Sequence, residues 1–161
     1  MSTFEEEART RIAPMANPLS GTPSGADLSY DPEFERVSSE IDKLSNLAGG
    51  SIDWMLISED SSRMLSERTK DLRLAGWLTV AKAQREGWKG VTEGLFVTQA
   101  LVDNLWDSMF PPAKRARARA SLLTWLWESL EKTLMERPVG AADVDAVKAL
   151  ESLISKLDER L

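Results

Sequence analysis

The sequence predicts an all-α protein of about six mainly antiparallel helices in one compact bundle, with an irregular Pro/Gly-rich N-terminal arm. Apolar residues recur at helical spacing in separate segments, and no segment alternates with the period of a β-strand. The links between these segments are short, which favours antiparallel neighbours. A chain of 161 residues has the length of one domain. We therefore expect the arm over residues 1–30 and the helical domain over residues 31–161.

The arm is expected to be largely irregular because prolines and glycines interrupt it. A short acidic turn of helix can form around Phe4–Ile12, before Pro14 ends the pattern. The sequence therefore predicts an arm that is mobile or lies on the surface of the domain.

The end of the arm, GTPSGADLSYDPEF at residues 21–34, joins turn residues to a helix start. Pro23 fixes one φ, Gly25 allows a positive φ, and Asp27 can accept a hydrogen bond from the backbone two residues further on. We expect this segment to lie against the domain because three of its side chains favour burial: Leu28, Tyr30 and Phe34.

Aspartates are suited to begin the first three helices as N-caps. Asp31 precedes Pro32, which fits the first helical position, and this helix continues to about residue 47. Asp53 begins a second helix, which ends near residue 67. Asp71 begins a third helix, which ends at Gly87.

Two features of the third helix are interpreted as structural. Lys70 and Asp71 are expected to link the second and third helices by capping and charge, without a catalytic role. Gly76 predicts a close helix contact, because glycine there costs about 1 kcal/mol relative to alanine.

Three more helices are expected over residues 91–106, 115–136 and 142–161. In the second of these, Trp125 and Trp127 fall on opposite flanks, and periodicity slightly favours Trp127 as the inner one. The last helix has apolar residues spaced like a short coiled-coil seam: Val147, Leu150, Ile154, Leu157 and Leu161.

Histidine and cysteine are both absent, which excludes Ser-His-Asp and Cys-His catalysis and removes the usual zinc ligands. Ser129 and Lys132 have the S-x-x-K spacing of a serine nucleophile with a lysine base. Leu130 between them belongs to the apolar stripe, and the companion motifs are absent. We therefore expect a protein that is not an enzyme and has no cofactor, and keep Ser129 and Lys132 as the candidates for a hydrolase.

The chain has 20 basic and 26 acidic side chains, a formal net charge of −6, with the excess acidity in the first 70 residues. This balance disfavours nucleic acid as a partner. No apolar run approaches the roughly 20 residues of a membrane span, so we expect no membrane insertion. The acidic N-terminus is unlike a secretory signal, and a cytoplasmic location is expected.

A basic run at the start of the fifth helix is the most charged surface candidate. Residues two apart in a helix point to opposite sides, so only Arg115 and Arg119 share a face. Solvation or pairing with nearby acids is the favoured interpretation, and an acidic protein partner is the next. Most of the six tryptophans are expected in the core, whereas Trp88 between Gly87 and Gly90 is the best candidate for an exposed partner anchor.

Several motifs follow one another along the chain. The first is the end of the arm, carried by Pro23, Gly25, Asp27, Leu28, Tyr30, Asp31, Pro32 and Phe34. Next come Asp53-Trp54, Lys70-Asp71-Leu72-Arg73 with Trp77-Leu78, and Leu105-Trp106 with Pro111-Pro112. In this order the motifs resemble the ImpA N-terminal family, found at the front of the TssA components of bacterial type VI secretion systems. A weaker similarity to the family follows at Arg119, Leu123, Trp125 and Leu126, and it favours Trp125 as the inner tryptophan.

The resemblance implies a non-catalytic docking module that helps to organise baseplate and contractile sheath or tail tube assembly. Its partners would be other type VI secretion components, contacted near Trp88, Pro111-Pro112 and Arg115–Arg119. Because the ring-forming regions of the family lie beyond the matched part, we expect a monomer or weak dimer, and a higher oligomer only with C-terminal regions. The alternatives are a self-associating helical scaffold of another bacterial system, suggested by the last helix, and the Ser129/Lys132 hydrolase.

Overall fold

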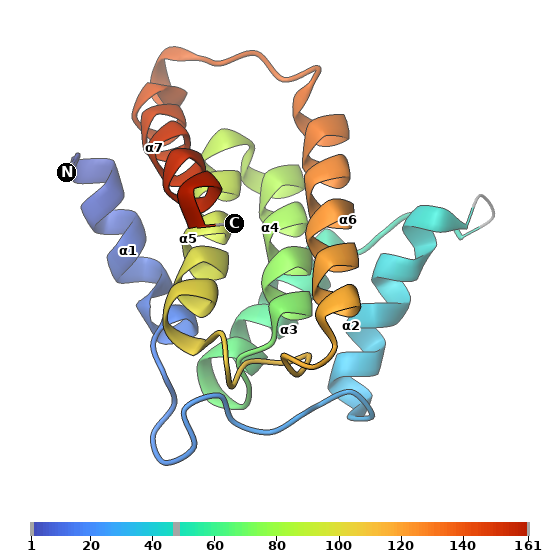
Figure 1. Cartoon of the computed structure of the whole chain (residues 1–161). Helices are drawn as coiled ribbons and strands as arrows, with labels where there is room; N and C mark the ends of the chain where they lie inside the picture. The colour runs from blue at the N-terminus through green and yellow to red at the C-terminus, as the bar shows by residue number, and fades with distance from the viewer. Residues whose placement is uncertain (1, 47–48, 161) are drawn as a thin grey trace.

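A computed structural model describes residues 2–46 and 49–160, and over these residues it contains helices and no β-strand (Figure 1). The all-α prediction is confirmed. The helices are α1 (Thr3–Ala16), α2 (Pro32–Asp42), α3 (Trp54–Glu67), α4 (Leu72–Glu86), α5 (Trp88–Leu105), α6 (Ala116–Leu134) and α7 (Val144–Arg160), with 3₁₀ turns η1 (Lys43–Ser45) and η2 (Ala141–Asp143).

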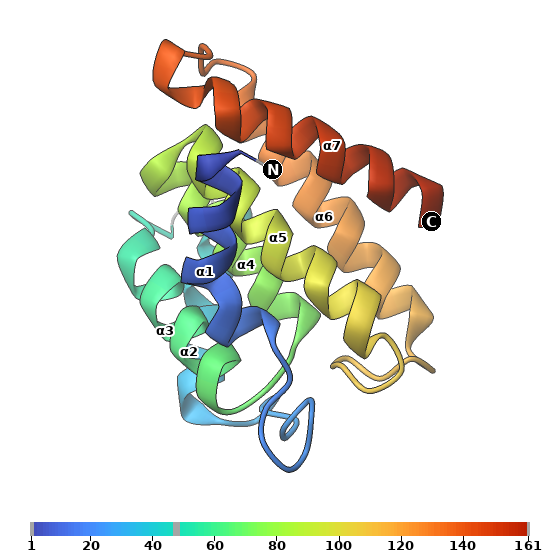
Figure 2. The same ribbon diagram turned by 90° about the vertical axis from the view of Figure 1, so that its left-hand side faces the viewer.

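The antiparallel pair α4 and α5 forms the centre of the fold (Figure 1). Helices α3 and α6 pack on α4, whereas α1 and α7 pack on α5, and α2 lies outside α3. In the view of Figure 2, α1 and α7 lie over the α5 side of the molecule. Helix α6 therefore contacts the bundle mainly through α4, and both of its flanks remain accessible.

The closest helix approach lies between α4 and α5. A Cβ atom built on Gly94 would lie 2.6 Å from the Cα of Thr79, nearer than ordinary packing allows. The same atom built on Gly76 would lie 3.6 Å from Leu122 Cδ1, an ordinary contact distance. A Cβ atom on Gly90 of α5 would lie 2.1 Å from the Lys82 carbonyl oxygen of α4. The tight glycine contacts are therefore at Gly90 and Gly94, between α4 and α5, and not at Gly76, which faces α6.

The first half of the arm differs from the expectation, because residues 3–16 form a helix of 14 residues. Ser2 caps α1 by accepting a hydrogen bond from the Glu5 amide at 3.1 Å. Ala8, Ile12 and Ala16 are buried on one face, and α1 packs against α5 and α3. Pro14 predicted the end of the helix, but α1 continues to Ala16 because burial of its apolar face stabilises the last turn.

The inner face of α7 also differs from the expected seam. The buried residues are Ala146, Ala149, Leu150 and Leu153, whereas Ile154 is exposed. The Thr92 hydroxyl of α5 donates to the Ala146 carbonyl oxygen at 2.9 Å, an approach that small alanines allow. Two of the seam positions lie outside the described side chains: Leu157 and Leu161.

Candidate functional site

The end of the arm lies against the domain, as expected. The Lys70 amide donates to the Ser24 carbonyl oxygen at 2.7 Å, and the Ala26 amide donates to the Arg68 carbonyl oxygen at 3.2 Å. Gly25 has a φ of 69°, and a Cβ atom there would lie 2.1 Å from the Arg68 carbonyl oxygen. Only glycine fits at this position, which explains its place in the motif.

Tyr30 contradicts the expectation of burial, because 92% of its surface is exposed. Leu28 and Phe34 are buried as expected. Tyr30 falls in the turn before the first residue of α2, where the chain bends away from the core. The tyrosine of the motif is therefore available to a partner.

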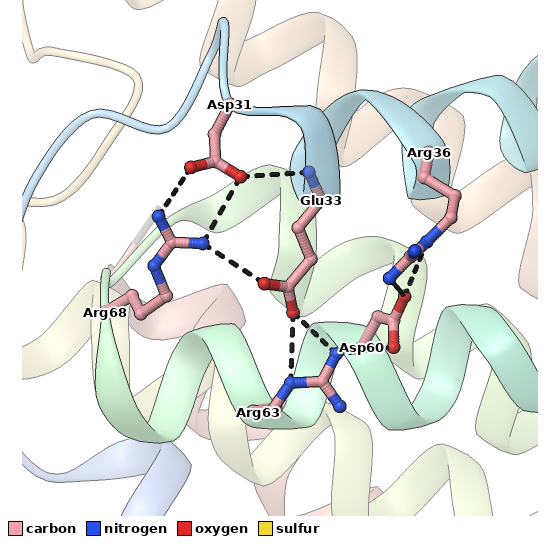
Figure 3. A network of polar contacts seen from close by, with 6 residues as sticks. All are labelled: Asp31, Glu33, Arg36, Asp60, Arg63 and Arg68. Atoms are coloured by element: carbon pink, nitrogen blue, oxygen red, sulfur yellow. Dashed lines mark hydrogen bonds and ion pairs between the residues drawn. The ribbon is translucent and has the colours of Figure 1, made fainter.

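Asp31 caps α2 and also pairs with α3 (Figure 3). Its carboxylate accepts from the Glu33 amide at 2.9 Å, which confirms the predicted cap. The Arg68 guanidinium donates to the same carboxylate at 2.5 Å. This hydrogen bond from Arg68 keeps the pKa of Asp31 below its ordinary value, with help from the Glu33 amide.

A second carboxylate of the network in Figure 3 lies on α3. Asp60 is buried, and it accepts from Arg36 of α2 at 2.6 Å and from Arg63 at 2.7 Å. Burial acts to raise the pKa of Asp60, but the hydrogen bonds from the two arginines outweigh it and the pKa is lowered. Glu33 also accepts from Arg63 at 2.7 Å. These ion pairs fix α2 on the outer side of α3.

Lys70 is fully buried and closes the ends of two helices. Its ammonium donates to the carbonyl oxygens of Pro14 at 3.1 Å, Met15 at 2.9 Å and Leu65 at 2.6 Å. These carbonyls belong to the last turns of α1 and α3, where backbone acceptors lack helical partners. Burial lowers the pKa of Lys70 to about 8. Lys70 was expected to link the second and third helices by capping and charge, whereas its ammonium binds backbone carbonyl groups at the ends of α1 and α3.

Asp71 joins α4 to neighbouring chain segments. Its carboxylate caps α4 by accepting from the Arg73 amide at 2.9 Å, and it pairs with the Arg73 guanidinium at 2.7 Å. The next amide, of Leu72, donates to the Phe110 carbonyl oxygen at 2.7 Å, and the Phe110 amide donates to the Lys70 carbonyl oxygen at 2.9 Å. The predicted cap is confirmed, and the motif ties α4 to the loop after α5.

Arg119 is buried, with 2% of its surface exposed, so its side chain cannot form an exposed docking pair with Arg115. Its guanidinium donates to the carbonyl oxygens of Pro111 at 2.8 Å and Met109 at 3.0 Å. It also lies 4.5 Å from the centre of the Trp106 ring. Sequence spacing predicted one accessible face for the two arginines, whereas Arg119 is covered by the loop before α6, whose carbonyl oxygens it contacts. Arg115 itself is exposed.

Trp88 was expected to be the exposed tryptophan, but Trp127 and Trp106 are the exposed ones. Trp88 is half-buried, and its indole donates to the Pro138 carbonyl oxygen at 3.3 Å. Trp127 is 59% exposed and Trp106 is 41% exposed. Trp125 packs against the core, so of the two tryptophans of α6 it is the inner one, as the family resemblance favours.

An open cleft of about 760 Å³ lies between α2 with η1 on one side and α6 on the other. We name it the α2–α6 cleft. Polar residues of both walls, among them Asp42, Glu128 and Lys132, line it too. Its apolar lining consists mainly of Ile41, Leu44, Trp54, Trp77, Leu122 and Trp125. Leu44 is 45% exposed, an accessible apolar side chain at the edge of the cleft.

Ser129 and Lys132 both line this cleft, but the hydrogen bond recorded at Ser129 is made by its carbonyl oxygen, which accepts from the Thr133 hydroxyl at 2.8 Å. That is a local helix contact and does not activate the serine hydroxyl. Over residues 2–46 and 49–160 no cluster of acidic side chains could hold a metal ion. The contact at Ser129 therefore gives no support to the Ser129/Lys132 hydrolase.

Sequence reasoning did not predict that these residues together line one cleft. Most of the six tryptophans were expected in the core, and Trp54, Trp77 and Trp125 do pack on the buried cluster, although periodicity slightly favoured Trp127 over Trp125 as the inner one. Their partial exposure depends on the separation between α2 and α6. No local sequence pattern predicts that separation. The one usable signal was the wide apolar face of α6, with Trp125 and Trp127 on opposite flanks.

Comparison with family models matches residues 16–128, more than half of the chain, to the model described as ImpA, N-terminal, type VI secretion system. The chain belongs to this family. The matched region runs from the end of α1 through most of α6, and it contains the motifs that tie the arm, α4 and the α5–α6 loop together. The ImpA N-terminal family is a type VI secretion family, and its description names no enzyme.

A solved structure supports the same assignment. The chain is 29% identical, with a TM-score of 0.70, to the N-terminal domain including the conserved ImpA_N region of the TssA component from Burkholderia cenocepacia. The match covers 80% of this chain and 51% of the other, so the chain spans about half the length of that solved chain. Comparison with curated proteins gives no match. Within the part of the chain that the structure describes, no helix is both long and apolar enough to cross a membrane.

Proposed function

We propose that the chain is a non-catalytic docking module of a type VI secretion assembly protein. It binds other components of the apparatus and helps to organise the assembly of the baseplate and of the contractile sheath or tail tube. The family match carries this proposal, since it places the chain in the secretion system. The TssA domain from Burkholderia cenocepacia supports it through similarity of both fold and sequence.

The α2–α6 cleft is the docking surface that fits this function best. Aromatic and aliphatic side chains line it beneath a polar edge, a composition typical of protein contact sites. Most of its lining lies within the residues that match the family model. Tyr30 offers a second exposed aromatic contact from the same family motif region. The signature residues around Lys70, Asp71 and Arg119 serve the docking function indirectly, by holding the fold.

The docking surface is tested by measuring the binding of purified baseplate, sheath and tube components to immobilised protein. Leu44→Glu places a charge at the edge of the cleft without removing a core side chain, and should weaken binding by about tenfold or more. Met55→Glu is the matched control, because Met55 is an exposed apolar residue that does not line the cleft. Equal loss in both variants, or no loss in Leu44→Glu, would remove the cleft from the docking surface.

The proposed module acts in the cytoplasm, with no cofactor, and as a monomer or weak dimer. Its alternative is a self-associating scaffold that uses the last helix. Light scattering at several protein concentrations separates the two, because a scaffold forms a concentration-independent oligomer. A tight ring or tetramer of this chain would exclude the monomeric docking module.

A further inference from the structure

A second groove lies on the other flank of α6, between α6 and α7, with α5 as its floor. We name it the α6–α7 groove, and its volume is about 220 Å³. Helix α6 packs on α4 and α7 packs on α5, so the two walls are supported separately. Six apolar side chains form most of the surface: Val91, Leu95, Trp127, Leu130, Leu150 and Ile154.

The lining of this groove has the apolar composition of a surface that a helix can cover. Two helices flank a third, and the apolar lining residues recur along α6 from Trp127 to Leu134, seven residue steps or about 10 Å of helix. Trp127 and Ile154, one on each wall, are exposed although they are large and apolar. An amphipathic helix of two to three turns would cover both, as in other helix-in-groove complexes.

The charge at the groove is acidic. Glu131 lines it, and no lysine or arginine is among its described lining residues. Glu151 is exposed and lies one turn before Ile154 on the same face of α7, by helical spacing. A partner helix with lysine or arginine beside its apolar stripe would therefore meet complementary charge. A second copy of this chain, related by two-fold symmetry, would instead bring the acidic edges of both copies together.

We infer that the α6–α7 groove binds a short amphipathic helix of another protein, with basic residues flanking an apolar stripe. The inference rests on the proposed docking function and adds a second surface to it. Helix α7 lies beyond the residues that match the family model, so the family match does not imply this surface. The short groove predicts moderate affinity, because only three or four apolar anchors fit along it.

The probe is a synthetic helical peptide of about 16 residues, with leucines at i, i+3, i+4 and i+7 and lysine or arginine on both flanks. A second peptide carries glutamates on the flanks instead. Fluorescence anisotropy measures the affinity of each peptide for the wild type and for the variants Trp127→Glu and Glu131→Lys. Glu131→Gln is added to remove the charge without reversing it. Met135→Glu is the matched control, because Met135 is exposed directly after the end of α6 but does not line the groove.

The basic peptide should bind the wild type and Met135→Glu alike, and bind Trp127→Glu and Glu131→Lys about tenfold or more weakly. Glu131→Gln should give an intermediate loss, and circular dichroism should show unchanged helix content in every variant. Equal binding of the two peptides, or full binding by Trp127→Glu, would overturn the inference. So would a dimer of the wild type that Trp127→Glu dissociates, since a second copy would then be the occupant.

The same variants are measured against purified baseplate, sheath and tube components. Weaker binding of a component to Trp127→Glu and Glu131→Lys supports the inference. If components bind but both variants retain them fully, the inference fails and the proposed docking function stands. If no component binds the wild type, the proposed function fails whatever the peptides do.

Discussion

The ammonium of Lys70 donates to the carbonyl oxygen of Met15 at 2.9 Å, and so joins two parts of the chain 55 residues apart. The same ammonium reaches Leu65 of α3. One buried cation therefore holds the last turn of α1 against the end of α3 and the start of α4. Lys70, the lysine of the K-D-L-R motif, therefore fixes the N-terminal helix α1 to the rest of the domain.

Replacing this cation should destabilise the protein. Lys70→Met leaves three carbonyl oxygens without their donor, and we expect the free energy of unfolding to fall by about 3 kcal/mol, at roughly 1 kcal/mol per lost hydrogen bond. Urea denaturation followed by circular dichroism measures it. Lys89→Met removes an exposed lysine and serves as the control, with little expected change. A Lys70→Met protein as stable as the wild type would show that the carbonyls find other donors.

The cap of α4 gives a second stability prediction. Asp71→Ala should lower the free energy of unfolding by about 1–2 kcal/mol, since it removes the acceptor of the Arg73 amide. Asp71→Asn keeps a capping oxygen and should recover part of the loss. Thermal melting of both variants tests the role of the cap. If Asp71→Ala has the melting temperature of the wild type but no longer binds its partner protein, Asp71 is a contact residue and not a structural one.

The network of Figure 3 predicts a loss of stability in acid. The pKa of Asp31 lies below its ordinary value of 3.8 in the folded protein, so the unfolded chain binds more protons as the pH falls. The stabilising contribution is complete above the unfolded pKa and is lost as the pH falls through the folded pKa. Urea denaturation at a series of pH values from about 5 to about 3 should show a shallower decline in Asp31→Asn and in Arg68→Gln than in the wild type. A decline of unchanged steepness in both variants would contradict this assignment.

Two glycines of the central helices make a matched pair. Gly94→Ala should destabilise the protein by about 1–3 kcal/mol, because the added methyl group meets the Thr79 backbone across the α4–α5 contact. Gly76→Ala adds a methyl group at ordinary contact distance from Leu122, so it should be neutral or stabilise by up to about 1 kcal/mol through helix propensity. The denaturation midpoint should therefore fall for Gly94→Ala and stay the same or rise for Gly76→Ala. A larger loss for Gly76→Ala would place the tight helix contact at α6.

Local chemistry predicted much of the fold. Asp31, Asp53 and Asp71 cap their helices as expected, because a cap depends on a side chain and the two or three residues that follow it. The failures have tertiary causes. Tyr30 is exposed because the chain turns away from the core before α2, and the first helix extends past Ile12 because its small apolar face is buried.

The candidate site was less accessible to sequence reasoning than the fold. Arg119 was expected on an accessible face of α6 together with Arg115, whereas its burial depends on the loop carbonyls of Met109 and Pro111 folding over it. The α2–α6 cleft depends on the distance between two helices that are remote in sequence. Trp125 and Trp127 were assigned to opposite flanks, and each flank proves to border an open surface.

Photo-crosslinking in cells that assemble a type VI secretion apparatus tests the docking function most directly. Benzoylphenylalanine is introduced at position 44, at the edge of the α2–α6 cleft, and at position 55 as the control outside it. We expect a covalent adduct from position 44 to a baseplate, sheath or tube component, identified by mass spectrometry, and a much weaker one from position 55. Absence of any adduct to a secretion component from position 44, or equal adducts from both positions, would contradict docking through this cleft.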